Sequence, residues 1–288
     1  MGMSIEETPI PFDIDRQLTP EEMGEISNYC KYDVLGTETL FEKRMDYFNT
    51  KSSIIRLGRL SKNNLGETNA KLTSKVLKAF KKDTFNDTNN FLMPSNLRLG
   101  KYEGLLSLFE NGIPESTIDG IIGGLPVSYG LGGLHGAIKG FSGTENDLGH
   151  KYAIIDFESF YPALMITQGL MSRNATDKKL FTELFEKRKE VMKTNPIVGK
   201  AYKQVLVSTY GSMEYRFNNL YDPCHRRNIA VSGQLFLTDL VDKLEDIVEL
   251  IQVNTDGIIV KIADNNIQEV YKRLEGFKRR TGLSTTID

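Results

Sequence analysis

Apolar and polar residues recur with two periods along the chain, and these periods separate predicted helices from predicted strands. The 3.6-residue period predicts helices over residues 20–48, 70–81, 162–171, 177–193, 198–214, 231–250 and 265–281. Short apolar runs predict strands over residues 152–156, 250–253 and 257–262. Between them, residues 112–149 are rich in glycine and predict loops and hairpins. The mixture predicts an α/β chain of the α+β type.

Residues with strong local preferences place several boundaries of these elements. Thr19-Pro20-Glu21-Glu22 has an N-cap residue, a proline at the first helical position and acids in the first turn. Thr194-Asn195-Pro196 predicts a tight turn that makes its two flanking helices antiparallel neighbours. Asn254-Thr-Asp256-Gly predicts a hairpin with Asp256 in the turn.

Composition excludes several classes of protein. A chain of 288 residues that is 40% hydrophobic can form one large domain or two modest ones. Its two cysteines, Cys30 and Cys224, argue against a disulfide framework and a cysteine-rich zinc site. Three scattered histidines argue against a histidine-based metal site. With no membrane-length apolar run and no signal-peptide pattern, we expect a soluble cytoplasmic chain with no membrane partner.

Charge is distributed unevenly, although the net charge is only −2. Residues 1–42 hold ten acidic and two basic residues, whereas residues 51–101 hold eleven basic and three acidic ones. Residues 177–227 hold eleven basic and six acidic residues. Two basic stretches in a nearly neutral chain are consistent with local contacts to phosphates, and solvated helix faces are the alternative.

Two apolar strands a hundred residues apart each deliver an aspartate to their tip. The first is Lys151–Pro162, which carries Asp156, and the second is Leu250–Val260, which carries Asp256. Alone, Asp156 is also explained as a helix cap and Asp256 as ordinary hairpin chemistry. As a pair, two like charges would repel and raise each other's pKa, and a divalent cation would remove that cost. Two such carboxylates are what a pair of magnesium ions needs for phosphoryl transfer.

One face of the predicted helix 198–214 carries residues suited to a nucleotide. Lys203 and Tyr210 are about 10.5 Å apart along a helix that rises ~1.5 Å per residue. This separation is comparable to a nucleotide laid from its phosphates to its base. Lysines there can neutralise phosphate charge, and Tyr210-Gly211 offers an aromatic surface with close backbone access. Packing together with solvated lysines is the alternative. The residues on this face are Lys200, Lys203, Val207, Tyr210 and Gly211.

In this order, the motifs resemble those of family B DNA polymerases, and most closely the small polymerases of bacterial viruses. Asp156-Phe-Glu-Ser159-Phe160-Tyr161-Pro162 is similar to motif A, except that the family has leucine where this chain has Phe160. Lys203–Gly211 is similar to motif B, with Val207 in place of asparagine. Asn254-Thr255-Asp256-Gly257 falls on motif C and keeps only the threonine and the second aspartate. The resemblance extends over nearly the whole chain.

The resemblance implies a mostly antiparallel palm sheet flanked by helices, with a two-helix antiparallel fingers subdomain. It implies that Asp156 and Asp256 hold two Mg²⁺ ions, with the Phe157 carbonyl as a further ligand. Ser159 and Phe160 would contact the triphosphate, and Tyr161 would exclude a 2′-hydroxyl. Lys203, Tyr210 and Gly211 would bind the nucleotide, with Lys200, Lys193 and Arg188 as weaker candidates. Gly132, Gly133 and Thr255 would contact DNA.

The departures from the family pattern affect what the chain is expected to do alone. Asn254 lacks the charge of the first motif C aspartate, Val207 removes an amide, and Gly257 removes a hydroxyl. Tyr29-Cys-Lys-Tyr-Asp33 is similar to the last exonuclease motif, but its upstream partners are missing, so we expect no exonuclease and a helix-surface location for these residues. The thumb expected after motif C is also missing.

These observations predict an organisation by residue range. We expect an exonuclease remnant at 1–50, a basic connecting region with the glycine-rich loop at 51–150, palm at 151–172 and 215–288, and fingers at 173–214. The spacing between motifs leaves no room for the insertions of protein-primed members, so we expect extension of a nucleic-acid primer.

We therefore expect a DNA-directed DNA polymerase fragment or split subunit. Its expected partners are primer–template DNA, deoxynucleoside triphosphates (dNTPs) and a second polypeptide carrying exonuclease and thumb, in the cytoplasm of a bacterial host. The alternative is a catalytically incomplete half that binds DNA or a partner chain and is active only when complemented. A different palm-fold nucleotidyltransferase, such as a primase or a reverse transcriptase, is a third reading.

Overall fold

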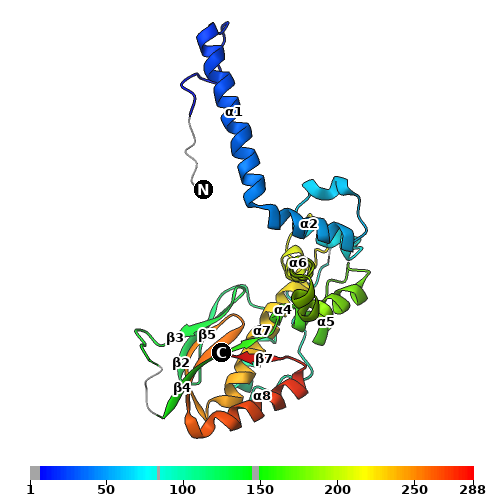
Figure 1. Cartoon of the computed structure of the whole chain (residues 1–288). Coiled ribbons are helices and arrows are strands. Elements are labelled where there is room, and N and C mark those ends of the chain that lie inside the picture. Colours follow the sequence, from blue (N-terminus) through cyan, green and yellow to red (C-terminus); the bar gives the residue numbers. More distant parts are fainter. Residues whose placement is uncertain (1–6, 83–84, 145–148) are drawn as a thin grey trace.

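A computed structural model describes residues 7–82, 85–144 and 149–288. Within these ranges the strands form one seven-stranded sheet in the order β1-β2-β3-β5-β6-β4-β7, and helices flank it (Figure 1). All neighbouring strands are antiparallel. The predicted α+β class with a mostly antiparallel sheet is confirmed.

The strands fall into two groups that meet at β3 and β5. The first group is a meander of three strands, which realises the hairpins predicted for the glycine-rich region: β1 Ile118–Ile122, β2 Leu125–Gly130 and β3 Gly133–Ala137. The second group contains the two predicted apolar strands and their hairpin partner, together with a short edge strand: β4 His150–Phe157, β5 Val248–Asn254, β6 Gly257–Ala263 and β7 Thr285–Ile287. Strand β7 was not predicted, because three residues are too few to establish alternation.

The helices agree with prediction in existence but differ at their ends. The α-helices are α1 Pro20–Lys43, α2 Met45–Leu57, α3 Asn69–Val76, α4 Phe160–Thr167, α5 Lys178–Thr194, α6 Pro196–Ser212, α7 Pro223–Leu244 and α8 Ile267–Thr281. The short 3₁₀ segments are η1 Lys62–Gly66, η2 Gly100–Phe109 and η3 Asp264–Asn266.

Two predicted helices need correction. The helix predicted over 20–48 is broken at Arg44, whose φ and ψ of −108° and 19° end α1 and start α2. The helix predicted over 231–250 begins instead at Pro223, because the side chain of Asp222 accepts a hydrogen bond from the His225 amide and caps it. Its predicted last turn belongs to β5.

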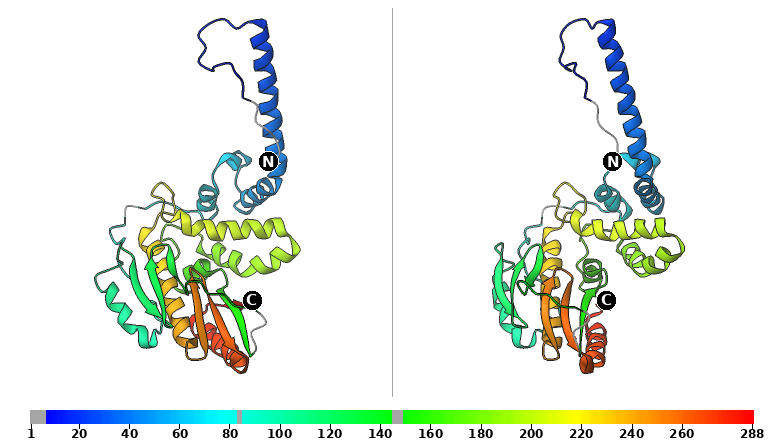
Figure 2. Two further views of the ribbon diagram at one scale, coloured as in Figure 1. Left: turned by 90° about the vertical axis from the view of Figure 1, so that its left-hand side faces the viewer. Right: turned by 60° about the vertical axis from the view of Figure 1, so that its left-hand side comes forward.

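One face of the sheet is covered and the other is open (Figure 2). Side chains on the covered face, such as Ile155, Ile258 and Val260, pack into the main core with α7 and α8. Ile154, one residue away on β4, lies on the open face and is 43% exposed. Because successive side chains of a strand point to opposite faces, Asp156 lies on the same open face as Ile154.

Helices α5 and α6 form the expected antiparallel pair beside the sheet (Figure 2). Asn195 starts α6 by accepting a hydrogen bond from the Val198 amide at 3.2 Å. Gly199 allows the two helices to approach closely, since a Cβ there would lie 2.6 Å from the Cα atom of Met192.

Helix α1 projects away from the rest of the chain and buries none of its residues (Figure 1). Its N-terminus has the predicted capping box between Thr19 and Glu22. None of the helices within the described residues combines the length and apolarity needed to cross a membrane.

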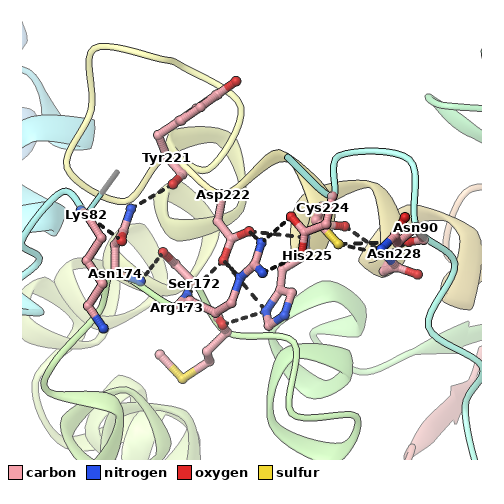
Figure 3. Close-up of polar contacts among 12 residues, drawn as sticks. Lys82, Asn90, Ser172, Arg173, Asn174, Tyr221, Asp222, Cys224, His225 and Asn228 are labelled. Atoms are coloured by element: carbon pink, nitrogen blue, oxygen red, sulfur yellow. Dashed lines mark hydrogen bonds and ion pairs between the residues drawn. The ribbon is translucent and has the colours of Figure 1, made fainter. Parts of the chain in front are cut away.

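A partly buried ion-pair network joins three segments next to α5 and α7, and Figure 3 shows its contacts around Arg173 and Asp222. The guanidinium of Arg173 donates to both oxygens of Asp222, at 3.0 and 2.7 Å, and to Asp87 at 2.6 and 3.1 Å. Asp222 is fully buried and also caps α7. The ring of Phe85 lies 3.8 Å from the Arg173 guanidinium carbon. Hydrogen bonds from Arg173 lower the pKa of Asp87 below its usual range.

Replacing Arg173 should destabilise the fold strongly, because Asp222 would remain buried without its counter-ion. For Arg173→Met we expect a loss of about 3 kcal/mol in the free energy of unfolding, measured by denaturant titration. The double variant Arg173→Met/Asp222→Asn should recover part of the loss. The exposed Arg279→Met is the matched control and should change stability by about 0.5 kcal/mol or less. An Arg173→Met protein as stable as the control would contradict a structural role for the network.

Candidate functional site

The fold brings the two strand-tip aspartates together. Asp156 is the penultimate residue of β4 and pairs with Gly257 of β6. The β5–β6 hairpin closes through the pair Asn254 and Gly257, which leaves Asp256 in its turn, as predicted. The amide of Phe157 donates to the carbonyl of Asp256 at 2.8 Å, so the end of β4 is fastened to this turn.

The electrostatics of the pair agree with this proximity. Burial raises the pKa of Asp156, and the nearby charges of Asp256 and Asp288 raise it further. Asp256 itself is exposed in the turn. The strand tips therefore concentrate negative charge at one end of the open face, as two neighbouring carboxylates must when no cation separates them.

Gly257 leaves the space that the Asp156 side chain occupies. A Cβ atom at Gly257 would lie 1.8 Å from Oδ1 of Asp156, far inside van der Waals contact. Any larger residue at position 257 would therefore force the carboxylate of Asp156 into another rotamer. The absence of a side chain at Gly257 therefore sets the orientation of the Asp156 carboxylate.

The connection between β4 and α4 holds an unusual backbone conformation at Ser159. Its φ and ψ are 52° and 48°, in the left-handed region that few non-glycine residues adopt. Its side chain does not cap α4. Such strain is often found at functional sites, where the surrounding structure maintains it. The backbone turns sharply at Ser159, and α4 begins at Phe160, so the first amides of α4 follow directly after the aspartate.

Aromatic side chains connect this turn to α6. Phe160 stacks on Phe157 with ring centroids 4.2 Å apart, and Tyr161 contacts Tyr210 of α6 at 4.3 Å. Burial raises the pKa of both tyrosines, so both hydroxyls stay protonated at neutral pH. The guanidinium of Arg226 lies 5.0 Å from the Tyr210 ring centroid.

Residues from four separate parts of the chain line one pocket of about 380 Å³, called here the α4–α6 pocket. Two cations, Arg188 of α5 and Lys203 of α6, share it with the carboxylate of Asp256. Cations and a carboxylate around one cavity suit a ligand that carries both negative charge and bound cations. The lining residues are Ser159, Phe160, Tyr161, Pro162, Arg188, Lys203, Val207, Tyr210, Thr255 and Asp256.

The glycine-rich loop packs against the turn of the β5–β6 hairpin. Gly133 has a φ of 134°, and a Cβ there would lie 2.9 Å from Oγ1 of Thr255. Gly132 precedes it and is exposed. The three residues predicted to contact DNA, Gly132, Gly133 and Thr255, are therefore neighbours in space although they lie more than a hundred residues apart in sequence.

Some predicted residues lie outside the α4–α6 pocket. Lys200 forms an ion pair with Asp46 at 2.9 Å and lines a different cavity. Gly211 is exposed near the end of α6 and does not line the pocket. Lys193 is exposed in the last turn of α5. On α1, Asp33 is exposed, and Tyr29 packs edge-on against Phe12 with centroids 6.0 Å apart.

An ion pair that the sequence did not predict connects the β4–α4 turn to α5. Lys189 of α5 donates to both carboxylate oxygens of Glu158 at 2.6 Å. Glu158 lies inside motif A, so the strained turn at Ser159 is anchored to the neighbouring helix hairpin. Glu158 and Lys189 are thirty-one positions apart in sequence, and only the packing of α5 against the turn identifies the pair.

The donors at the strand tips suit a hard divalent cation. In an extended residue the amide and the carbonyl point to the same edge of the strand, so the Phe157 carbonyl faces the hairpin that its amide contacts. Two carboxylates and a carbonyl form an all-oxygen set of the kind Mg²⁺ binds with waters or substrate phosphates. In the part of the chain that the structure describes, no three Asp, Glu, His or Cys side chains converge to hold a metal ion.

Comparisons with known proteins find a distant likeness among solved structures. No protein-family model matches the chain, and no curated protein matches it. Among solved structures, it is similar to a family B DNA polymerase from the hyperthermophilic archaeon Pyrobaculum calidifontis, with a TM-score of 0.46 and 13% sequence identity. The alignment covers 94% of this chain and 35% of that polymerase, so the chain spans about a third of its length.

The proximity of the two aspartates can be tested directly. Removing the charge of Asp256 should lower the pKa of Asp156, which should nevertheless stay above its ordinary value because burial is the larger cause. We expect this shift in Asp256→Asn, measured by ¹³C NMR titration without divalent cations. Asp119→Asn on the exposed edge strand β1 is the control and should leave the titration unchanged. An Asp156 pKa that does not respond to Asp256→Asn would mean that the carboxylates are not neighbours.

Proposed function

We propose that this chain is the palm and fingers part of a DNA-directed DNA polymerase of family B type, adding deoxynucleotides to a primer 3′-hydroxyl. The observation that carries the proposal is the convergence of the three motifs on the α4–α6 pocket. Ser159 to Pro162, Lys203 to Tyr210, and Thr255 to Asp256 come from three separate segments and line one cavity. Chance resemblance of short motifs would not require them to meet.

The chain's own residues account for how a triphosphate would be held. Lys203 and Arg188 would neutralise its phosphates from the two fingers helices, α6 and α5. The amides of Ser159 and Phe160 would donate to phosphate oxygens at the start of α4. Tyr161, held against Tyr210, would form a rigid floor under the sugar. Val207 and Tyr210 would pack against the nascent base pair.

Asp156 and Asp256, with the Phe157 carbonyl, would hold two Mg²⁺ ions. When bound, these ions would activate the primer hydroxyl and stabilise the charge that develops on the leaving pyrophosphate. The aspartates fix the distance between the hydroxyl and the nucleotide, because β4 and the β5–β6 hairpin are hydrogen-bonded into one sheet. The exposed side of the site next to Gly132-Gly133 and Thr255 would receive the primer–template.

By this proposal, palm residues are 151–172 and 215–288 and the fingers are 173–214, with the strands of 118–137 extending the palm sheet. The region 1–50 would be what remains of an exonuclease domain. The similarity to polymerases of bacterial viruses rests on the motifs alone, and with it we propose the cytoplasm of a bacterial host as the location.

A second candidate function is a half-polymerase that binds DNA or a partner chain and is active only when complemented. Two observations favour it. Asn254 leaves motif C with one carboxylate, and α1 exposes apolar side chains such as Val34 and Leu35 that a partner chain carrying exonuclease and thumb could cover. Both candidates use the same pocket and differ only in whether this chain suffices.

Removing either aspartate should abolish nucleotide addition. For Asp156→Ala and Asp256→Ala we expect a loss of several orders of magnitude in the rate of single-nucleotide extension of a labelled primer–template with Mg²⁺ and dNTP. Asp119→Ala is the matched carboxylate control and should retain the full rate. Extension that survives in both aspartate variants would overturn the site. Extension that appears in the wild type only after a thumb-bearing chain is added would select the second candidate.

Tyr161 should set the choice between deoxyribonucleotides and ribonucleotides. Its ring is fixed by Tyr210, so Tyr161→Ala opens space below the sugar, and we expect discrimination against ribonucleotides to fall about tenfold or more. Tyr161→Phe keeps the ring and should keep the discrimination. The measurement is the ratio of kcat/KM for dNTP and NTP. Equal ratios in wild type and Tyr161→Ala would remove this residue from sugar selection.

A further inference from the structure

A second cavity lies between α2 and α6 and shares a wall with the α4–α6 pocket. This α2–α6 pocket has a volume of about 420 Å³, within the range of ~300–1,000 Å³ typical of small-molecule sites. Lys203 and Val207 line both cavities. The two helices are in direct contact, and α2 lies across α6 at the base of the projecting α1 (Figure 1). No motif identified in the sequence accounts for the residues of α2 in this pocket.

Lys51 is the most informative residue of the α2–α6 pocket. It is only 7% exposed, yet among the residues that the structure describes it pairs with no carboxylate. Its described contact is with the ring of Tyr47, whose centroid lies 5.5 Å from Nζ. The one acid in the lining, Asp46, is already paired with Lys200. Lys51 lines the pocket, so an anionic ligand there would supply the counter-ion that its ammonium lacks.

The rest of the lining suits a nucleobase. Tyr47 offers an aromatic ring, and Arg44 and Lys51 both lie within reach of it, at 5.2 and 5.5 Å from the ring centroid. The side-chain amides of Asn69 and Gln204 line the same cavity. Within the described residues, Oδ1 of Asn69 is buried and accepts no hydrogen bond, which leaves an acceptor for a ligand.

The position of the pocket indicates which nucleic acid it would hold. Val207 is 54% exposed on the ridge of α6 that separates the two cavities, an unusual place for an aliphatic side chain. A nucleotide that is base-paired in the α4–α6 pocket would lie on one side of this ridge. The neighbouring unpaired nucleotide would lie on the other side. Three lysines against one acid, with one aromatic ring, fit a single strand, whose bases are free to stack and whose phosphates need cations.

We propose that the α2–α6 pocket binds one unpaired nucleotide of single-stranded DNA, with a phosphate on Lys51 and the base against Tyr47. This inference rests on the proposed function, which makes that nucleotide the next template residue to be copied. The shared chemistry, a base attached to a phosphate, would also fit a free nucleotide, so the test separates the two sources.

Binding should be measured with Asp256→Ala protein, so that the result does not depend on catalysis. Two primer–templates are compared by fluorescence anisotropy: one is blunt at the primer end and the other carries a three-nucleotide template overhang. We expect the overhang to tighten binding, and Tyr47→Ala to remove about tenfold or more of that gain. Lys51→Met should remove a similar part and reduce the salt dependence by about 0.7 in slope. Free dAMP competing as well as the overhang would assign the pocket to a free nucleotide and overturn the proposal.

Controls keep folding defects apart from lost contacts. Tyr47→Phe keeps the ring and should bind the overhang normally, whereas Arg279→Met, on the exposed face of α8, should bind both DNAs like the parent. Thermal unfolding identifies any variant that fails to fold, and Lys51→Gln then replaces Lys51→Met. Equal affinity of parent and variants for the overhang DNA would overturn the proposal.

Crosslinking gives an independent readout. A 5-iodouracil at the first unpaired template position should crosslink to Tyr47 on irradiation, and mass spectrometry should locate the adduct in a peptide of α2. An adduct confined to the open face of the sheet, for example on Phe141, would overturn the proposal. The crosslink needs no extension activity, so a chain that binds the overhang but never extends a primer would fail the proposed function while retaining this site.

Discussion

The antiparallel pairing of β4 with β6 is the interaction on which the candidate site depends. Its register sets Asp156 opposite Gly257, and the hydrogen bond from the Phe157 amide to the Asp256 carbonyl fastens the strand end to the hairpin turn. A slip of one residue would turn Asp156 into the core and bring an apolar side chain to the open face. Buried residues on the other face, among them Ile155 and Val260, oppose such a slip because it would expose them to water.

Around this pair, the site is completed by elements outside the sheet. The turn at Ser159 is clamped by Glu158 and Lys189, and Tyr161 meets Tyr210 across the gap to α6. At the far side of the same helices, Arg173 and Asp222 secure the connection into α5 and the start of α7. The arrangement places a sheet that carries acids beside a helix pair that carries cations.

The sequence predicted the strands that carry the aspartates, the antiparallel helix pair and the hairpin turn, because each has a strong local pattern. It did not predict β7, the break at Arg44 or the start of α7. Strand β7 is too short to show an alternating pattern, and the break at Arg44 depends on packing between α1 and α2. The start of α7 depends on Asp222-Pro223, which was not recognised as a helix cap. Pairs such as Glu158 with Lys189, and the cavity between α2 and α6, arise only from tertiary contacts. The resemblance to polymerase motifs named most of the residues that line the α4–α6 pocket, but it did not predict that Lys200 pairs with Asp46 instead.

Lys203 and Val207 form a common wall of two cavities, and this has a thermodynamic consequence. A ligand that shifts either side chain changes the surface offered to the ligand on the other side. By linkage, the free energy of this coupling is the same in both directions, so each occupant must favour or oppose the other equally. A single turn of α6 would then allow the occupant of one cavity to select the occupant of the other without any movement of the sheet.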